Sequence, residues 1–185
     1  QCHALGREFR CAPFPPVMAT LHMSLTSIGW LFTVGVLIHN TEEALRLPAW
    51  SLHTGKWYAP VDPREFRFAV VALSALLVIF ALSSSFTAAG SASSYLMAGY
   101  VLAMVLNVFI PHVIATVCMW RYMPGTATAL VFNLPLGLMY LSRALSENQI
   151  ELHVFCWIGP IVVLGIMASI PVLFLLGRKL FAAPV

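Results

Sequence analysis

Two histidines and two glutamates are the residues of this chain best suited to chemistry. His39, Glu42 and Glu43 stand in the run His-Asn-Thr-Glu-Glu at positions 39–43, and His112 lies in a later apolar segment. Because residues three and four apart share one face of an α-helix, both carboxylates are expected beside the His39 imidazole. Zinc and iron accept imidazole nitrogen and carboxylate oxygen together. The pattern predicts a site for a divalent transition metal, zinc or iron, held by His39, Glu43 and His112.

The segments around these side chains are strongly apolar. Of the 185 residues, 60% are hydrophobic and only 9% are charged, and the mean hydropathy is +0.87. A soluble domain is about one quarter charged. The charges are crowded into short connections, which leaves apolar runs of roughly twenty residues, long enough for a helix to cross a bilayer. The composition therefore predicts an integral membrane protein.

Five apolar segments predict an all-α, polytopic bundle of about five membrane-spanning helices. They cover residues 21–44, 66–86, 94–120, 126–145 and 153–176. Residues 21–180 are expected to form a single transmembrane helical domain, preceded by an extramembrane arm at 1–20. The first connection, 45–65, mixes tryptophan, tyrosine and proline, which is typical of a segment at the headgroup level.

The basic residues predict the orientation of the bundle. With five crossings, the first and third connections and the C-terminus share one side. That side carries seven basic residues, and the other side carries three, which are Arg7, Arg10 and Arg143. The excess of positive charge predicts a cytoplasmic C-terminus, and we expect the bacterial cytoplasmic membrane as the location.

The same topology predicts that polar side chains of three helices share one layer. His39 lies five residues from the cytoplasmic end of its segment, and His112 lies eight residues from the end of the third. At about 1.5 Å per residue, their depths differ by only a few ångströms. Asn133 falls at a matching depth in the fourth segment, and Asn107 lies in the same segment as His112. Buried polar groups in membranes tend to face the bundle interior or a wet cavity.

The leading hypothesis is a membrane metalloenzyme, a metal-dependent hydrolase or isomerase. Glu42 would be the general base or a further ligand, and Asn107 or Asn133 would orient the substrate. A lipid-like or prenyl-like substrate is expected, because a site at this depth opens to the bilayer more readily than to water. We expect membrane lipids around the chain, no organic cofactor and no nucleic-acid partner.

Two other interpretations remain open at this stage. A glutamate buried beside a histidine can shuttle protons, which suits a metal-free isomerase acting on a sterol-like or polyprenyl substrate. Alternatively, the small-residue stretch 88–94 and the abundant aromatic side chains could pack against other helices. The chain would then be a non-catalytic subunit of a larger membrane complex.

The motif at 39–43 resembles the one that names the HXXEE family of small, mostly bacterial membrane proteins. The similarity covers residues 28–143 and includes the segment from Asn107 to His112, the turn Arg-Tyr-Met-Pro-Gly-Thr-Ala at 121–127 and the Pro-Leu-Gly at 135–137. The resemblance implies a polytopic membrane protein with its site at the motif. The family is defined by this motif rather than by a reaction, so the resemblance bears on architecture more than on chemistry.

Overall fold

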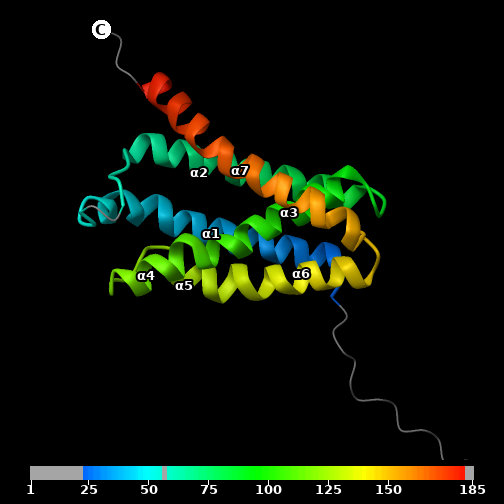
Figure 1. Cartoon of the computed structure of the whole chain (residues 1–185). Helices are drawn as coiled ribbons and strands as arrows, with labels where there is room; N and C mark the ends of the chain where they lie inside the picture. Colours follow the sequence, from blue (N-terminus) through cyan, green and yellow to red (C-terminus); the bar gives the residue numbers. More distant parts are fainter. Residues whose placement is uncertain (1–22, 56–57, 182–185) are drawn as a thin grey trace, which may run out of the picture.

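The computed structural model describes residues 23–55 and 58–181, and every regular element in these ranges is helical (Figure 1). The helices form five rods. They are α1 (Leu25–Ser51); α2 (Pro63–Phe86); α3 (Ala92–Asn107) with η1 (Val108–Val113) and α4 (Ile114–Cys118); α5 (Thr126–Thr128) with η2 (Ala129–Asn133) and α6 (Leu134–Ser146); and α7 (Leu152–Phe181). Within these ranges the predicted all-α bundle of five helices is confirmed. The arm predicted at residues 1–20 lies outside them.

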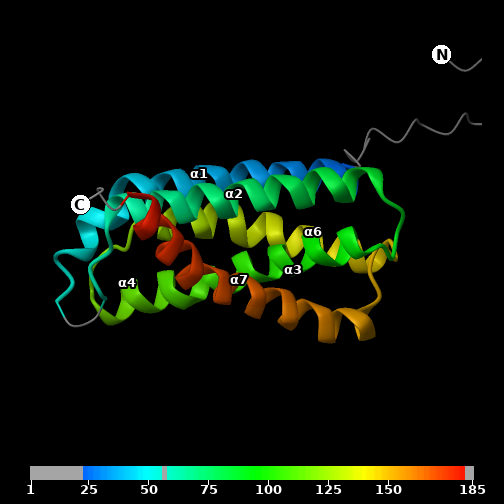
Figure 2. The same ribbon diagram turned by 90° about the horizontal axis from the view of Figure 1, so that it is seen from above.

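The five rods pack side by side with alternating directions (Figures 1 and 2). α1 contacts α2 on one side and the rod of η2 and α6 on the other, while α3 packs against α2, α6 and α7. The core between them is apolar, with Phe32, Leu77 and Val101 fully buried. Glycine allows close helix approach in this core, since a Cβ at Gly99 would lie 2.6 Å from the Cβ of Val162 on α7.

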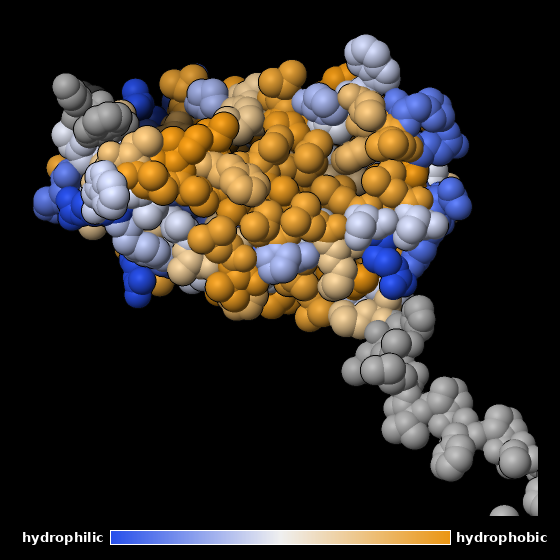
Figure 3. All heavy atoms as spheres, turned by 60° about the horizontal axis from the view of Figure 1, so that its bottom comes forward, coloured by the Kyte–Doolittle hydropathy of each residue, from blue (hydrophilic) through white to orange (hydrophobic). Residues whose placement is uncertain are grey.

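The outer surface of the bundle is suited to lipid. Four helical rods of the described chain are long and apolar enough to cross a membrane, and they cover Pro63–Phe86, Ala92–Cys118, Thr126–Ser146 and Leu152–Phe181. Figure 3 shows an apolar band across the middle of the face in view, with hydrophilic residues gathered at both ends. The remaining rod, α1, is less apolar because it carries the polar run 39–43. The chain is therefore an integral membrane protein.

The first helix ends later than the sequence predicts. A connection was expected from residue 45, with Pro48 as a helix breaker, but α1 continues through Pro48 to Ser51. Proline has no N–H to donate to the carbonyl four residues earlier, which here belongs to Ala44. Arg67 on α2 supplies that missing bond, because its Nε donates to the Ala44 carbonyl oxygen at 3.1 Å. The α1 helix thus continues past Pro48 while the Ala44 carbonyl keeps a hydrogen-bond donor.

The third rod is kinked where it carries His112. Ile110 has extended backbone angles, with φ −124° and ψ 110°, and Pro111 follows it. Proline also removes a helical hydrogen bond, so a bend is expected at this position. The bend separates α3 from α4, and α4 then continues to the end of the bundle where α1 also ends (Figure 1).

Candidate metal centre

His39 and Glu43 occupy one face of α1, one helical turn apart. The His39 side chain is fully buried, and Glu43 is largely buried with 15% of its side chain exposed. His39 Nε2 lies 3.8 Å from Glu43 Oε2. The helix period therefore brings an imidazole nitrogen and a carboxylate oxygen together inside the bundle.

His112 joins this pair from the kinked segment η1. Its side chain is fully buried, and its Nε2 lies 3.2 Å from Glu43 Oε1. The rings of His39 and His112 meet edge to face with their centroids 4.9 Å apart. The Glu43 carboxylate thus reaches both imidazoles, and one donor atom from each of the three residues lies within 4.8 Å of the other two.

Gly125 places the turn between α4 and α5 directly against both histidines. Its φ is +93°, a left-handed conformation that glycine adopts without strain. A Cβ at this position would lie 2.8 Å from Cε1 of His39 and 2.8 Å from Cε1 of His112. A larger residue would therefore collide with the site, so the close approach of this turn depends on glycine.

The turn also fixes the orientation of the His39 ring. His39 Nδ1 lies 3.1 Å from the Gly125 carbonyl oxygen and 3.2 Å from the Thr128 hydroxyl oxygen. Because a carbonyl oxygen can only accept, Nδ1 carries the proton and donates it. The other nitrogen, Nε2, is then left with a lone pair that faces Glu43, which is the arrangement found in metal-ligating histidines.

Glu42 serves a different set of contacts. Its Oε1 accepts a hydrogen bond from the Tyr122 hydroxyl at 2.9 Å, and its Oε2 accepts one from Thr128 at 2.9 Å. Arg46 lies 3.4 Å from the same carboxylate. Burial raises the pKa of Tyr122, and its bond to Glu42 adds to this effect, so the phenol remains a donor at neutral pH. Glu42 ties α1 to the turn that covers His39.

Several buried nitrogens of the site have no hydrogen-bond partner among the described residues. They are Nε2 of His39 and both ring nitrogens of His112. Although His112 Nε2 lies 3.2 Å from Glu43, its direction does not suit a hydrogen bond to that oxygen. Buried polar atoms are nearly always satisfied in proteins. The ligand atoms of His39, Glu43 and His112 lie within 4.8 Å of one another, while these imidazole nitrogens form no hydrogen bond with any described residue.

Comparison with known proteins agrees with the motif. The family described as "Protein of unknown function with HXXEE motif" matches residues 30–140. The chain belongs to this family. The HXXEE protein described here is also similar to "Uncharacterized protein YrkK" of Bacillus subtilis (strain 168), with 32% identity over 148 residues that cover 80% of this chain and 94% of YrkK. No solved structure matches the chain.

Among the described residues, the two asparagines form no hydrogen bond with the three donors of the HXXEE site. Asn107 is partly buried and lines a cavity of about 380 Å³ that also reaches Glu43 and Tyr58. Asn133 is fully buried in η2, where its amide has no hydrogen-bond partner among the described residues. The structure thus groups His39, Glu43 and His112, places Asn107 along the adjoining cavity, and records no bond from Asn133 to them.

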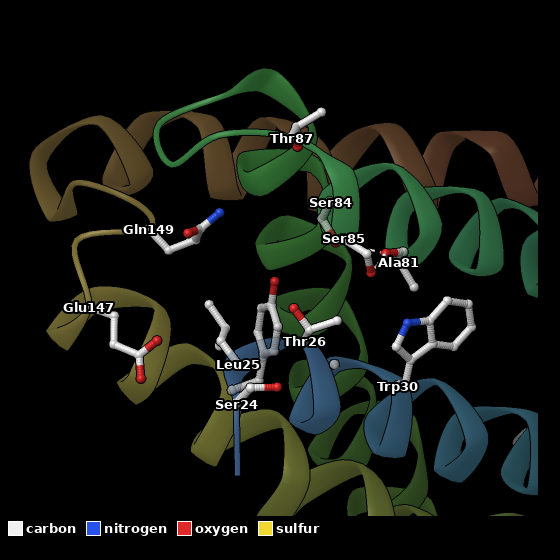
Figure 4. Close-up of a pocket in the computed structure, with 12 residues that line it drawn as sticks. Ser24, Leu25, Thr26, Trp30, Ala81, Ser84, Ser85, Thr87, Glu147 and Gln149 are labelled. Carbon is white, nitrogen blue, oxygen red and sulfur yellow. Dashed lines mark hydrogen bonds between the residues drawn. The ribbon is translucent and has the colours of Figure 1, made fainter. Parts of the chain in front are cut away.

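A second hollow of this HXXEE protein lies at the opposite end of the bundle. It has a volume of about 290 Å³ and is lined by the start of α1 and the ends of α2 and α6. Figure 4 shows hydroxyl and amide side chains around it, including Ser24, Ser84 and Gln149. Its one carboxylate, Glu147, is already bound by Arg143 Nε at 2.7 Å. Among the described residues that line it there is no histidine or cysteine, so it lacks the donors of a transition-metal site.

Three residues of the site were not singled out individually by the sequence. Tyr122, Gly125 and Thr128 hold the His39 ring and the Glu42 carboxylate from the turn after α4. Only the resemblance of the segment 121–127 to the HXXEE family drew attention to this turn. The contact joins residues 86 positions apart along the chain, which local sequence patterns do not reveal.

Proposed function

We propose that this HXXEE protein is a metalloenzyme of the bacterial cytoplasmic membrane in which His39, Glu43 and His112 hold zinc or iron. The observation that supports it is the convergence of fully buried, unpartnered imidazole nitrogens on a single carboxylate. Each imidazole that binds a metal must present a lone pair, and the Nδ1 bond to the Gly125 carbonyl leaves His39 in the suitable tautomer.

The spacing of the donor atoms supports the same proposal. Two ligand atoms about 2.1 Å from a shared tetrahedral metal lie about 3.4 Å from each other. His112 Nε2 lies 3.2 Å from Oε1 of Glu43, and His39 Nε2 lies 3.8 Å from the other carboxylate oxygen, Oε2, so the two distances fall on either side of that value. Small side-chain shifts would therefore suffice for binding.

The surroundings of the site favour a lipid-like or prenyl-like substrate. Glu43 lies in the wall of the cavity of about 380 Å³, and most of the other residues in that wall are apolar. When bound, a divalent transition metal supplies Lewis acidity for hydrolysis or isomerisation. Asn107 lines the same cavity and is suited to orienting a polar group of the substrate. Both oxygens of Glu42 accept hydrogen bonds from the turn, so we assign Glu42 a positioning role rather than that of the base.

The orientation of the protein follows from its charges. Arg46, Arg64, Arg67, Arg121 and Arg178 belong to the connections and the helix ends on the side of the candidate centre. Positive residues gather on the cytoplasmic side of membrane proteins. We therefore propose that the site opens in the cytoplasmic half of the bilayer and that the C-terminus is cytoplasmic.

Metal analysis of the purified protein tests this proposal. We expect about one zinc or iron ion per chain, and we expect His39→Ala, Glu43→Gln and His112→Ala to lose it because each removes a donor. His53→Ala is the matched control, since His53 is exposed at the end of α1 and is outside the donor group. A wild-type protein without stoichiometric metal, after expression with zinc and iron supplied, would contradict the proposal.

A metal-free isomerase is the second candidate. The observation that favours it is the 3.2 Å separation of Glu43 and buried His112 at the wall of an apolar cavity, because a rotation that aligned the two groups would allow proton transfer between them. Chelators separate the two candidates once an activity is found. Loss of activity with a chelator and recovery on adding zinc or iron support the metalloenzyme, whereas insensitivity supports the isomerase.

A further inference from the structure

The cavity beside the candidate centre is lined mainly by apolar side chains, with a few polar side chains among them. Its residues come from α1, α2, the third rod and α7, together with Tyr58 and Met123 from the connections. Its apolar part includes Phe66, Leu73 and Ile170. The volume of about 380 Å³ lies within the range of small-molecule sites in proteins.

The polar side chains of this cavity offer hydrogen bonds but no positive charge. Among the described residues that line it, Glu43 is the one charged group, and there is no lysine, arginine or histidine. Tyr100 already donates to the Leu73 carbonyl oxygen, and Asn40 donates to Ser74. Asn107 and Tyr58 are left as the side chains suited to contact a ligand.

Charge restricts the polar group that such a cavity accepts. If a divalent cation binds here, its charge and that of the Glu43 carboxylate sum to about +1. This charge does not neutralise a phosphate or a diphosphate. Burying an unpaired charge is very costly. Burial and the nearby Glu43 carboxylate also raise the pKa of Tyr58, so its hydroxyl remains a neutral donor. An uncharged oxygen group, such as an alcohol, fits these surroundings.

The mouth of the cavity faces the lipid. Ile110 on η1 and Met167 on α7 both line the cavity, yet they are 68% and 58% exposed. α7 packs against α2 and α3, and Figures 1 and 2 show its C-terminal half diverging from α4. The third rod is kinked at Ile110. An apolar opening therefore lies between η1 and α7, within the part of the bundle that is suited to lipid.

We propose that the cavity binds a single-chain lipid with an uncharged polar group, a prenyl or long-chain alcohol being the representative, which enters from the bilayer between η1 and α7. The chain lies along the apolar wall, and its oxygen reaches Glu43 near Tyr58 and Asn107. This inference rests on the proposed function, because it names the substrate class and the entrance of that same site.

Photo-crosslinking with a diazirine-bearing prenyl alcohol, using the full chain in lipid nanodiscs, tests the proposal. We expect the alcohol to label the wild type and the corresponding prenyl diphosphate to label it at least about tenfold less. Ile110→Trp and Met167→Trp narrow the mouth and should each reduce labelling by about tenfold. Leu164→Trp is the matched control, because Leu164 is exposed on α7 and does not line the cavity.

Two further measurements keep the outcomes distinct. Met167→Ala widens the mouth and should label at least as well as the wild type, which separates blocked entry from misfolding. Metal content is measured on the same samples. Equal labelling by the diphosphate, or full labelling of Met167→Trp, overturns the inference even if metal is bound. Alcohol labelling without metal supports the inference and contradicts only the metal centre.

Discussion

At the scale of single residues, the Thr128 hydroxyl contacts both Glu42 and His39. It donates to Glu42 Oε2 and lies 3.2 Å from His39 Nδ1. We predict that Thr128→Val lowers the affinity for zinc by about tenfold to hundredfold, the usual effect of removing a residue that orients a ligand. Titration against a chromophoric chelator measures this. Thr41→Val is the control, since the exposed Thr41 hydroxyl bonds only within α1. Unchanged zinc affinity in Thr128→Val would show that the Thr128 hydroxyl does not help to orient His39.

Gly125 carries a second prediction at this scale. Gly125→Ala forces alanine into the left-handed backbone conformation, which costs about 1–2 kcal/mol. It also places a methyl group 2.8 Å from Cε1 of both imidazoles. Overpacking adds about 1–3 kcal/mol, so we expect a lower melting temperature together with loss of bound metal. Gly90→Ala is the matched control, because Gly90 has φ +73° but open space around it. If both variants lower the melting temperature equally and keep the bound metal, the turn is not in tight steric contact with the histidines.

At the scale of elements, the start of α2 depends on the Asp62 carboxylate, which accepts hydrogen bonds from the backbone N–H groups of Arg64 and Glu65. The bonds from Glu65 and Arg64 hold the pKa of Asp62 below its usual value of 3.8. A carboxyl group whose pKa is lower in the folded state than in the unfolded state stabilises the fold at pH values above the unfolded-state pKa. This stabilisation is lost as the pH falls through the folded-state pKa. We predict that the melting temperature of the wild type exceeds that of Asp62→Asn at pH 6 and that the difference shrinks below about pH 4. Thermal unfolding of both proteins between pH 3 and pH 6 measures it, and a difference independent of pH would contradict the prediction.

The elements also show how far the sequence predicts this fold. The number and order of the helices follow from the lengths of the apolar runs, because a helix must satisfy its own backbone groups in lipid. The end of α1 does not follow, since Pro48 indicates a stop and the Arg67 donor that bonds the Ala44 carbonyl comes from the next helix. Local patterns contain no information about a partner from the next helix.

The sequence likewise predicts only part of the candidate site. The approach of His39 to Glu43 follows from helix period, and the nearness of His112 follows from counting residues to the end of each helix. The role of Gly125 could not be predicted, because its turn packs on α1 through tertiary contacts alone. The contacts of Glu42 with Tyr122 and Thr128 depend on the same turn.

At the scale of the whole molecule, the five rods place the two connections at 119–125 and 147–151 at opposite ends of the bundle (Figure 2). Arg121 and Glu147 are exposed in or beside these connections. If the excess of basic residues sets the orientation, Arg121 faces the cytoplasm and Glu147 faces outward. The candidate centre, which lies beside the first of these connections, then opens to the cytoplasmic half of the membrane.

Cysteine labelling decides this orientation. In a background with the four native cysteines replaced by serine, we predict that a membrane-impermeant maleimide labels Glu147→Cys in intact bacterial spheroplasts. Arg121→Cys should be labelled only after the membrane is permeabilised, because its thiol faces the sealed interior. The two variants control for each other, since both positions are exposed and both become reactive after lysis. The reverse pattern would place the His39, Glu43 and His112 group in the outer half, where an enzyme would meet lipids of the outer leaflet instead.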